Sequence, residues 1–246
     1  MERDEYEFMF RAEDHHWWYH GMRAITLGLL DRYVGRGRDL AVLDAGCGTG
    51  ACMQYLAPFG RVTGVDMAPE ALSFCQQRGL RRLARGSIAE LPFAADSFDL
   101  VTSFDVLSEC GLSYEAAVLG EFWRVLRPGG HLLLRLPAYE WLRGRHDELV
   151  HTRHRYTRGE IVSRLRERGF HIERSSYANC FLFPLAALKR LKDRLLPPAQ
   201  AGSDVTVSGG WSNGLLARVF AAEAPLVRRM RLPFGLTAIV LARKPR

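Results

Sequence analysis

The sequence lacks the features that mark membrane-spanning and secreted proteins. Its apolar stretches are all shorter than the roughly 18 residues that a membrane-spanning helix needs. Residues 1–5 are mostly charged, and no apolar segment typical of a signal peptide follows them. The five cysteines form no C-x-x-C pair, and such an odd, scattered set is typical of a reducing compartment. We therefore expect a cytoplasmic protein.

Acidic residues are scarce in the second half of the chain. The net charge is +7, but residues 1–130 contain 13 Lys/Arg and 18 Asp/Glu, whereas residues 131–246 contain 21 and 9. A basic half of this kind suits an acidic or phosphorylated substrate, an anionic membrane surface or RNA. A plain solvated surface is the alternative. The basic residues are not interleaved with an aromatic platform, so we do not expect nucleic acid as a partner.

The segment VLDAGCGTG at residues 42–50 is the most informative part of the sequence. Apolar residues run into an acid, three glycines follow at alternate positions, and a helical pattern begins at Ala51. This order predicts a buried strand, a tight turn and the start of a helix. Glycine is needed because a side chain would keep a ligand away from the backbone, whose free N–H groups can then meet it. The segment therefore predicts a nucleotide-binding loop.

Two acids near this loop indicate which nucleotide it binds. The dinucleotide fingerprint G-x-G-x-x-G holds a pyrophosphate, whereas the spacing here is G-x-G-x-G and Asp44 stands two residues before the first glycine. A carboxylate at that position repels a pyrophosphate and suits an ammonium group. Asp66 follows Gly46 by twenty residues and ends the next expected strand, where an acid accepts from two ribose hydroxyls. An ammonium, a ribose and no pyrophosphate describe S-adenosylmethionine.

With three later motifs, the loop resembles the class I S-adenosylmethionine-dependent methyltransferases, in the large type 11-like group with a D-x-G-C-G-T-G loop. The later motifs are GSIAELPF at 86–93, DSFDLV at 96–101 and RVLRPGG at 124–130. The resemblance implies an α/β fold with a Rossmann-like seven-stranded sheet of order 3-2-1-4-5-7-6. It also implies helices on both faces of the sheet and an antiparallel last strand.

The chain divides, on this reading, into four parts of a single domain over residues 1–246. These are an N-terminal helical lid (1–35), a cofactor-binding core (36–180), a helical insertion or cap (181–235) and the last strand (236–246). The expected strands lie at about 40–45, 61–66, 81–85, 98–104, 131–136, 170–178 and 236–242. Thr157 with Glu160 three residues later predicts a capping box before a helix of about 158–168.

The resemblance also implies which residues hold the cofactor. The expected cofactor-binding residues are Asp44, Gly46, Cys47, Gly48, Asp66, Met67, Ser87, Ile88, Phe104 and Arg23. The acid and glycines of the loop would hold the methionine end, Asp66 the ribose, and Met67 the adenine face. Ser87 replaces an acid found in many relatives, so the Ile88 backbone N–H would meet the adenine. Arg23 would pair with the methionine carboxylate.

Residues 16–23, HWWYHGMR, resemble an N-terminal helix that closes over the cofactor in some relatives. Trp18 is therefore expected to contact the substrate, with ordinary helix packing as the alternative. Asp105 follows the fourth strand beside the expected methyl end, and we predict it as a catalytic base or as a backbone-positioning residue. The same place lacks an Asn-Pro-Pro-Tyr-like element, which argues against methylation of an adenine or glutamine amide nitrogen.

A second cluster of titratable residues follows the fifth strand, at the edge where ligands bind in open α/β sheets. We predict His151 as a catalytic base and His146, Arg155 and Tyr156 as substrate-binding residues. Metal binding through His151 and His154 is the other specific interpretation, but we expect no metal because no cysteine lies nearby. The third interpretation is that these residues form a solvated loop without a role in binding.

The insertion begins with an apolar segment and continues as an amphipathic one, FLFPLAALKRLKDRLL at 181–196. Leu185, Leu188, Leu191, Leu195 and Leu196 fall at helical spacing, and the basic residues Lys189, Arg190, Lys192 and Arg194 occupy the remaining face. The helix either packs its leucines on the domain as a cap or lies peripherally on an anionic membrane.

The sequence thus predicts an S-adenosylmethionine-dependent methyltransferase acting on a small-molecule or lipid-linked acceptor, and the basic second half of the chain would suit an anionic one. We expect the acceptor atom to be oxygen rather than nitrogen. An RNA methyltransferase is the alternative enzyme, and a non-catalytic binding protein with this fold is the alternative outside enzymes.

Overall fold

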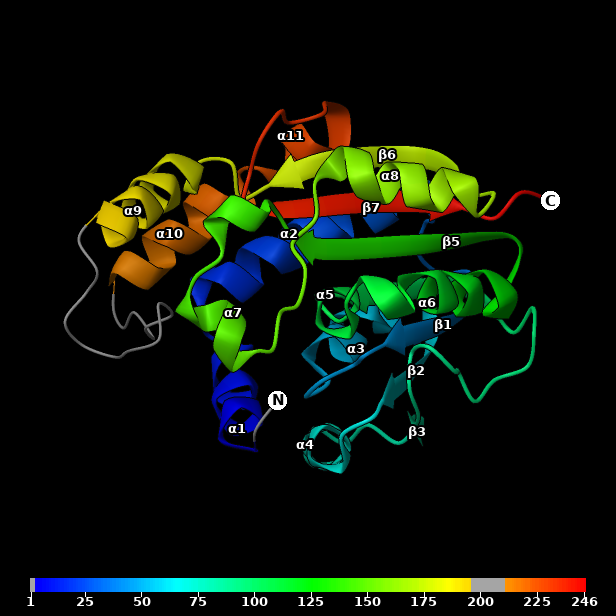
Figure 1. The fold of residues 1–246 in the computed structure, drawn as a ribbon. Helices are drawn as coiled ribbons and strands as arrows, with labels where there is room; N and C mark the ends of the chain where they lie inside the picture. Colours follow the sequence, from blue (N-terminus) through cyan, green and yellow to red (C-terminus); the bar gives the residue numbers. More distant parts are fainter. Residues whose placement is uncertain (1–2, 196–210) are drawn as a thin grey trace.

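A seven-stranded mixed sheet forms the centre of the computed structural model, which describes residues 3–195 and 211–246 (Figure 1). The strand order is β3-β2-β1-β4-β5-β7-β6, as predicted. The strands are β1 Leu40–Ala45, β2 Gly60–Asp66, β3 Leu83–Arg85, β4 Phe98–Phe104, β5 Leu126–Pro137, β6 His171–Ala178 and β7 Thr237–Arg243. β7 runs antiparallel to both β5 and β6, while β1 to β5 pair in parallel.

The central strands are buried on both faces, which is why they read as continuous apolar runs in the sequence. β1 and β4 lie where they were predicted. β5 starts five residues earlier than expected, because Leu126 pairs with Phe98 before a bulge and the regular pairing resumes at His131. The Pro-Gly-Gly turn therefore lies within β5, between these two paired segments, rather than before the strand.

Helices cover both faces of the sheet. The longer ones are α1 Arg3–Ala12, α2 Trp17–Tyr33, α3 Ala51–Leu56, α4 Pro69–Gln77, α6 Leu112–Val125, α8 Arg158–Glu167, α9 Phe183–Leu195, α10 Trp211–Ala221 and α11 Ala224–Arg229. The short ones are α5 Leu107–Cys110, α7 Arg145–Leu149, η1 Ala57–Phe59 and η2 Glu140–Leu142. α8 begins with the predicted capping box between Thr157 and Glu160.

Two hydrophobic clusters, one on each face, hold these layers together. On one face Phe122 of α6 and Leu165 of α8 pack with Leu134 of β5. On the other face Ile25 of α2 and Phe220 of α10 pack with Leu133, the neighbour of Leu134 in β5. Successive residues of a strand point to opposite faces, so one strand serves both clusters.

The N-terminal helical segment is two helices rather than one. The first, α1, ends at Ala12, and α2 begins at Trp17 after a four-residue break. Met22, Ile25 and Leu30 of α2 are fully buried against the sheet, so α2 is a core helix. Tyr6 and Ala12 of α1 are also buried, but neither belongs to the hydrophobic cluster that contains α2.

The three helices of the insertion are held in different ways. α10 and α11 pack on α2, and the buried Glu223 between them accepts a hydrogen bond from the Phe181 amide at 2.7 Å. α9 is different, because Leu185, Leu188 and Leu191 are 67%, 65% and 56% exposed. The expectation that these leucines pack on the domain is therefore wrong. The side chain of Leu195 and the whole of Leu196 lie outside the described residues.

The contact between α2 and α10 gives a test of this arrangement. A Cβ added at Gly21 would lie 2.2 Å from the Phe220 ring, whereas a Cβ at Gly28 on the same helix would meet nothing closer than 3.9 Å. We expect Gly21→Ala to lower the free energy of unfolding by about 1–3 kcal/mol through overpacking. Gly28→Ala should raise it by up to about 1 kcal/mol, because alanine favours the helix. Urea denaturation of both variants measures this, and equal effects would contradict the packing described.

Candidate cofactor and active site

The candidate site lies at the carboxyl ends of β1, β2 and β4. The strand order reverses between β1 and β4, and ligands of open α/β sheets bind at such a switch point. The loop of residues 46–50 leaves β1 here and leads into α3. Asp44 near the end of β1 and Asp66 at the end of β2 flank the loop. The predicted acids and glycines are thus brought together at one edge of the sheet.

The loop backbone requires glycine for two separate reasons. Gly46 and Gly48 have φ values of 80° and 52°, a region that other residues rarely adopt. A Cβ at Gly46 would also lie 2.3 Å from Val106. At Gly48 the nearest atom is Cε of Met9 in α1, 2.9 Å away, which is the flexible end of a side chain. α1 therefore lies directly over the part of the loop where a ligand would approach the backbone.

Asp44 is a buried carboxylate with incomplete partners. It is 1% exposed, and its Oδ1 accepts a hydrogen bond from the Thr102 hydroxyl at 2.9 Å. Its Oδ2 has no hydrogen-bond partner among the described residues. Burial raises the pKa of Asp44 to about 7, although Thr102 and the charge of Arg135 act to lower it. A cationic group that reached Oδ2 would satisfy the orphaned oxygen, as expected of the residue that meets an ammonium.

Asp66 is held by the backbone around it. Its Oδ2 accepts from the Gly48 amide at 2.9 Å and its Oδ1 from the Ala68 amide at 3.0 Å. Burial raises the pKa of this carboxyl, and these amides act to lower it. Each oxygen keeps a second acceptor site for a ribose hydroxyl. Met67, the next residue, is 68% exposed. Its side chain is therefore not used by the core and can cover the face of an adenine.

The other predicted cofactor residues differ in what they can offer. The Ser87 hydroxyl accepts from the Ala89 amide at 3.1 Å, and the Ile88 side chain is buried. The Cys47 thiol packs in a small buried cluster, 3.9 Å from the Cys75 sulfur, so only its backbone can face a ligand. Arg23 is exposed and its guanidinium lies 5.8 Å from the centre of the Tyr55 ring.

Arg135 is a residue of the site that the sequence analysis missed. It lies in β5 with its side chain 8% exposed, and its Nε donates to Asp105 Oδ2 at 2.8 Å. Its guanidinium lies 4.6 Å from the centre of the Phe104 ring and 4.9 Å from that of Trp18. The available signal was a single cation within the apolar segment LLLRLP at 132–137. This contact supports a positioning role for Asp105 over the role of a catalytic base.

Glu109 is a second missed residue. It lies in α5, the short helix that follows Asp105, and its carboxyl feels the charges of Asp66 and Asp105 at the carboxyl edge. The pKa of this carboxyl is raised to about 7, mainly by burial and to a smaller extent by the charges of Asp66 and Asp105. A carboxyl that titrates near neutral pH beside a ligand site can accept a proton there.

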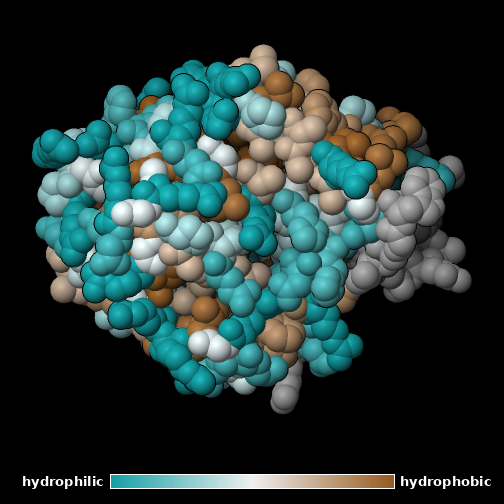
Figure 2. Space-filling model, turned by 180° about the vertical axis from the view of Figure 1, so that it is seen from behind, coloured by the Kyte–Doolittle hydropathy of each residue, from teal (hydrophilic) through white to brown (hydrophobic). Residues whose placement is uncertain are grey.

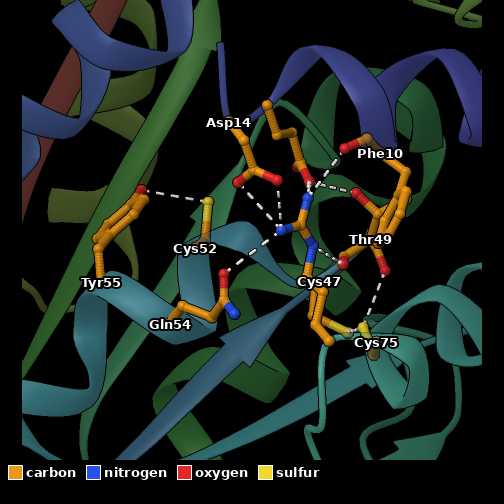
Figure 3. Close-up of polar contacts among 11 residues, drawn as sticks. Phe10, Asp14, Cys47, Thr49, Cys52, Gln54, Tyr55 and Cys75 are labelled. Carbon is orange, nitrogen blue, oxygen red and sulfur yellow. Dashed lines mark hydrogen bonds and ion pairs between the residues drawn. The ribbon is translucent and has the colours of Figure 1, made fainter.

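A third missed residue, Arg78 at the end of α4, fixes the N-terminal segment to the glycine loop. Its partners Phe10, Asp14 and Thr49 are labelled in Figure 3. Its Nε donates to the Thr49 carbonyl at 2.9 Å, and its Nη1 pairs with Asp14 at 2.9 Å. Its Nη2 donates to the Phe10 carbonyl at 3.0 Å and pairs with Glu13 at 3.2 Å. The Thr49 hydroxyl also donates to Glu13. One cation thus holds the end of α1 above the loop.

The predicted acceptor cluster is not assembled as expected. Tyr156 is fully buried in the core beside α6 and α8, and Arg155 is paired with Asp147 at 2.7 Å and with the Ala138 carbonyl at 3.0 Å. The buried Tyr156 ring contradicts its predicted role as a substrate contact, whereas the role of Arg155 stays a prediction. His151 is exposed with a φ of 55°, and the side chain of His146 lies outside the described residues. His154 contacts Glu160 at 2.8 Å.

Two alternatives from the sequence can be placed in the same way. Trp17 packs against Phe220, with ring centres 5.8 Å apart, so ordinary helix packing is the correct reading for it. Trp18 instead contacts Arg135.

Over residues 3–195 and 211–246, no three His, Cys, Asp or Glu side chains are grouped to hold a metal ion. No helix within those ranges is long and apolar enough to cross a membrane.

The sheet order, the glycine loop and the two flanking acids define a Rossmann-like methyltransferase fold with a nucleotide site. Residues 43–134 match the family described as a methyltransferase domain. A probable S-adenosylmethionine-dependent methyltransferase of Mycolicibacterium smegmatis is 32% identical over 165 residues, 65% of this chain and 62% of that protein. These matches and the fold support a class I S-adenosylmethionine-dependent methyltransferase family, whose members use S-adenosylmethionine.

Two further comparisons define the extent of the likeness. A malonyl-[acyl-carrier protein] O-methyltransferase of Pectobacterium atrosepticum is 40% identical over 93 residues, 37% of this chain and 36% of that protein. The chain therefore spans less than two thirds of the length of both curated relatives. A putative methyltransferase solved in complex with the Haloferax volcanii Trm112 activator has a TM-score of 0.62 at 21% identity, over 99% of this chain and 95% of that chain. That structure shows the shared fold.

The raised pKa of Asp44 gives a pH-dependent test of its role. Below pH 7 the carboxyl is mostly protonated in the free protein, and a bound ammonium favours its ionised form. We expect the affinity for S-adenosylhomocysteine to fall by up to about tenfold per pH unit below 7, with about one proton released on binding at pH 6. Calorimetry in buffers of different ionisation enthalpy measures that proton.

Two variants assign the released proton to one carboxyl. Asp44→Asn should bind more weakly at pH 8 and release no proton at pH 6. Glu109→Gln should still release about one proton on binding at pH 6, although Glu109 has a pKa in the same range. Proton release that persists in Asp44→Asn and disappears in Glu109→Gln would move the effect to Glu109.

Proposed function

We propose that this chain binds S-adenosylmethionine and transfers its methyl group to an oxygen atom of a small-molecule or lipid-linked acceptor. The observation that carries the proposal is the buried Asp44 carboxylate with its unpartnered Oδ2, placed beside a glycine loop and Asp66 at one end of the sheet. The Asp44 carboxylate fits an ammonium group, and Asp66 fits the ribose hydroxyls. The glycine loop lets the ligand lie close to the backbone. The residues therefore fit the cofactor of the family.

Each residue of the site has a distinct task in this proposal. The bound sulfonium supplies a methyl group that is already activated, so the protein supplies alignment and exclusion of water. Asp44 meets the ammonium and Asp66 the ribose hydroxyls. The α1 helix, held down by Arg78, covers the loop and limits the access of water. Asp105 fixes the Arg135 guanidinium next to Phe104, at the end of β4.

The nature of the acceptor is the finer part of the proposal. A relative named as a malonyl-[acyl-carrier protein] O-methyltransferase supports transfer to oxygen. The buried Arg135 and the excess of basic residues in 131–246 suit an acceptor that carries negative charge. A carboxylate acceptor is ionised at neutral pH and needs no general base, whereas a hydroxyl acceptor does. Glu109 is the residue we assign to that task for a hydroxyl.

The cofactor assignment is tested by binding. Asp66→Ala should weaken the binding of S-adenosylhomocysteine by about 1–3 kcal/mol, because two ribose hydroxyls lose their charged acceptor. Glu167→Ala is the control, since Glu167 is an exposed acid on α8. It should leave affinity unchanged in the same titration calorimetry. Binding of NAD without binding of S-adenosylhomocysteine would overturn the proposal.

The role of Glu109 is tested by turnover. With a hydroxyl acceptor, we expect Glu109→Gln to lower kcat by about 100-fold or more and to remove the rise of kcat with pH near 7. The affinity for S-adenosylhomocysteine at pH 8 should change little. An unchanged kcat would exclude Glu109 as the base and would favour an acceptor that is already ionised, such as a carboxylate.

The same assays separate the alternative functions. A non-catalytic binding protein would bind S-adenosylhomocysteine without transferring labelled methyl groups to any extract fraction. An RNA methyltransferase would retard RNA in a gel, and that binding would weaken steeply with salt because phosphate contacts release counterions.

A further inference from the structure

The outward face of α9 is an apolar surface that the fold leaves uncovered by the described residues. Leu185, Leu188 and Leu191 follow one another at three-residue intervals, so they share one side of the helix. All three are more than half exposed, whereas a helix of a globular protein ordinarily turns its apolar side to the core. Hydrophobic residues are gathered at this end of the molecule in Figure 2.

Exposed aromatic residues extend this surface toward the candidate site. The Phe183 ring of α9 lies 5.9 Å from the Trp141 ring of η2 and 5.2 Å from the Phe234 ring, and both Trp141 and Phe234 are exposed. We call this set the α9 surface: Phe181, Leu185, Leu188, Leu191, Trp141 and Phe234. It adjoins the segment that leaves the carboxyl end of β5, which is the end of the sheet that carries the site.

Polar contacts on the opposite side of α9 fix which face is turned outward. The Arg190 Nε donates to the Leu142 carbonyl at 3.0 Å, and its Nη1 lies 3.5 Å from Asp193. A Cβ added at Gly144 would lie 2.2 Å from the Arg190 guanidinium carbon, so the side chain rests directly on that glycine. The polar face of α9 is therefore attached to the turn after β5, and the leucines are left outside.

The charges near the leucines indicate which partner fits. Lys189 and Lys192 are exposed on α9, within the half of the chain where basic residues outnumber acidic ones by 21 to 9. The core of a protein–protein interface is depleted of lysine. An interfacial membrane helix instead combines leucines on one side with flanking lysines, whose stems reach along the apolar surface while the ammonium groups stay in water.

We propose that the α9 surface binds an anionic lipid bilayer and so presents the carboxyl edge of the sheet to a lipid-linked acceptor. The leucines and aromatic rings would enter the boundary between headgroups and acyl chains, and the lysines would face the lipid phosphates. The part that concerns the acceptor rests on the proposed function. The part that concerns the membrane does not, because vesicle binding is measured without turnover.

Flotation of the full chain with lipid vesicles tests the proposal. We expect the protein to float with vesicles that contain phosphatidylglycerol, and much less with vesicles of phosphatidylcholine alone. Leu185→Ser with Leu188→Ser should abolish flotation. Lys189→Gln with Lys192→Gln should weaken the partition by about 25-fold, which is about fivefold for each lysine, and raised salt should weaken it as well.

Matched variants exclude general effects of polarity or charge. Leu112→Ser changes a leucine of α6 that is also more than half exposed, and Arg81→Gln with Arg82→Gln removes two exposed cations near β3. Both controls should float like the unchanged protein. All variants should keep their affinity for S-adenosylhomocysteine, which shows that they fold and separates this proposal from the cofactor assignment.

Two results would overturn the inference. One is the absence of flotation with anionic vesicles at low salt, or flotation that the leucine and lysine variants leave unchanged. The other is a dimer in sedimentation that the leucine variants disrupt, which would assign the α9 surface to a second copy of the chain.

Discussion

The buried carboxylate of Asp44 is the constraint around which the site is arranged. A pKa of about 7 instead of the ordinary 3.8 means that ionising this group in the folded protein costs about 4 kcal/mol more than in water. Because the pKa is raised, the folded protein loses stability as the pH increases from 3.8 to about 7. At neutral pH it is therefore less stable than it would be with a solvated acid at this position. A cationic ligand that reaches the unpartnered Oδ2 restores that free energy as affinity. Asp44 therefore costs stability without a ligand, which is expected of a binding residue and not of a purely structural one.

The surroundings of Asp44 show how the fold limits this cost. Thr102 of the neighbouring strand donates to the carboxylate, and the Arg135 cation on the same face of the sheet lowers its pKa. Arg135 is itself buried and is supported by Asp105 and by the aromatic rings of Trp18 and Phe104. The negative charge of Asp44 in β1 and the positive charge of Arg135 in β5 thus compensate one another across β4, so removal of either would leave an uncompensated charge in the core.

Local rules explain which parts of this arrangement could be predicted. The strands follow from apolar runs, and the glycine loop follows from positions with positive φ next to a helix start. Asp44 and Asp66 are recognisable because their spacing from the loop is fixed by the strands that carry them. Each of these signals lies within about twenty residues of sequence, and a folded sheet of this order places all of them at one edge.

The residues that were missed depend on contacts between distant segments. Arg78 meets Asp14 across 64 residues and Arg135 meets Asp105 across 30, so neither pairing has a local pattern. Tyr156 was assigned to the wrong environment for a related reason. Its backbone lies beside Ala138 at the end of β5, as its place in the sequence suggested, but its ring turns into the core. Position along the chain predicts the edge of the sheet that a residue reaches, whereas packing decides the side to which it points.

The insertion shows the same division between pattern and orientation, and it leads to a functional distinction among its helices. Periodicity predicted an amphipathic α9 but did not determine whether its leucines face the core. α10 and α11 bury Phe220 and Val227 against α2, which makes them part of the hydrophobic cluster on that face. α9 contributes no fully buried residue among its described side chains, and it is attached through the Arg190 hydrogen bond and the ring contacts of Phe183. The core helices thus give the insertion its stability, and because that stability does not depend on the leucines of α9, those leucines are available for binding outside the domain.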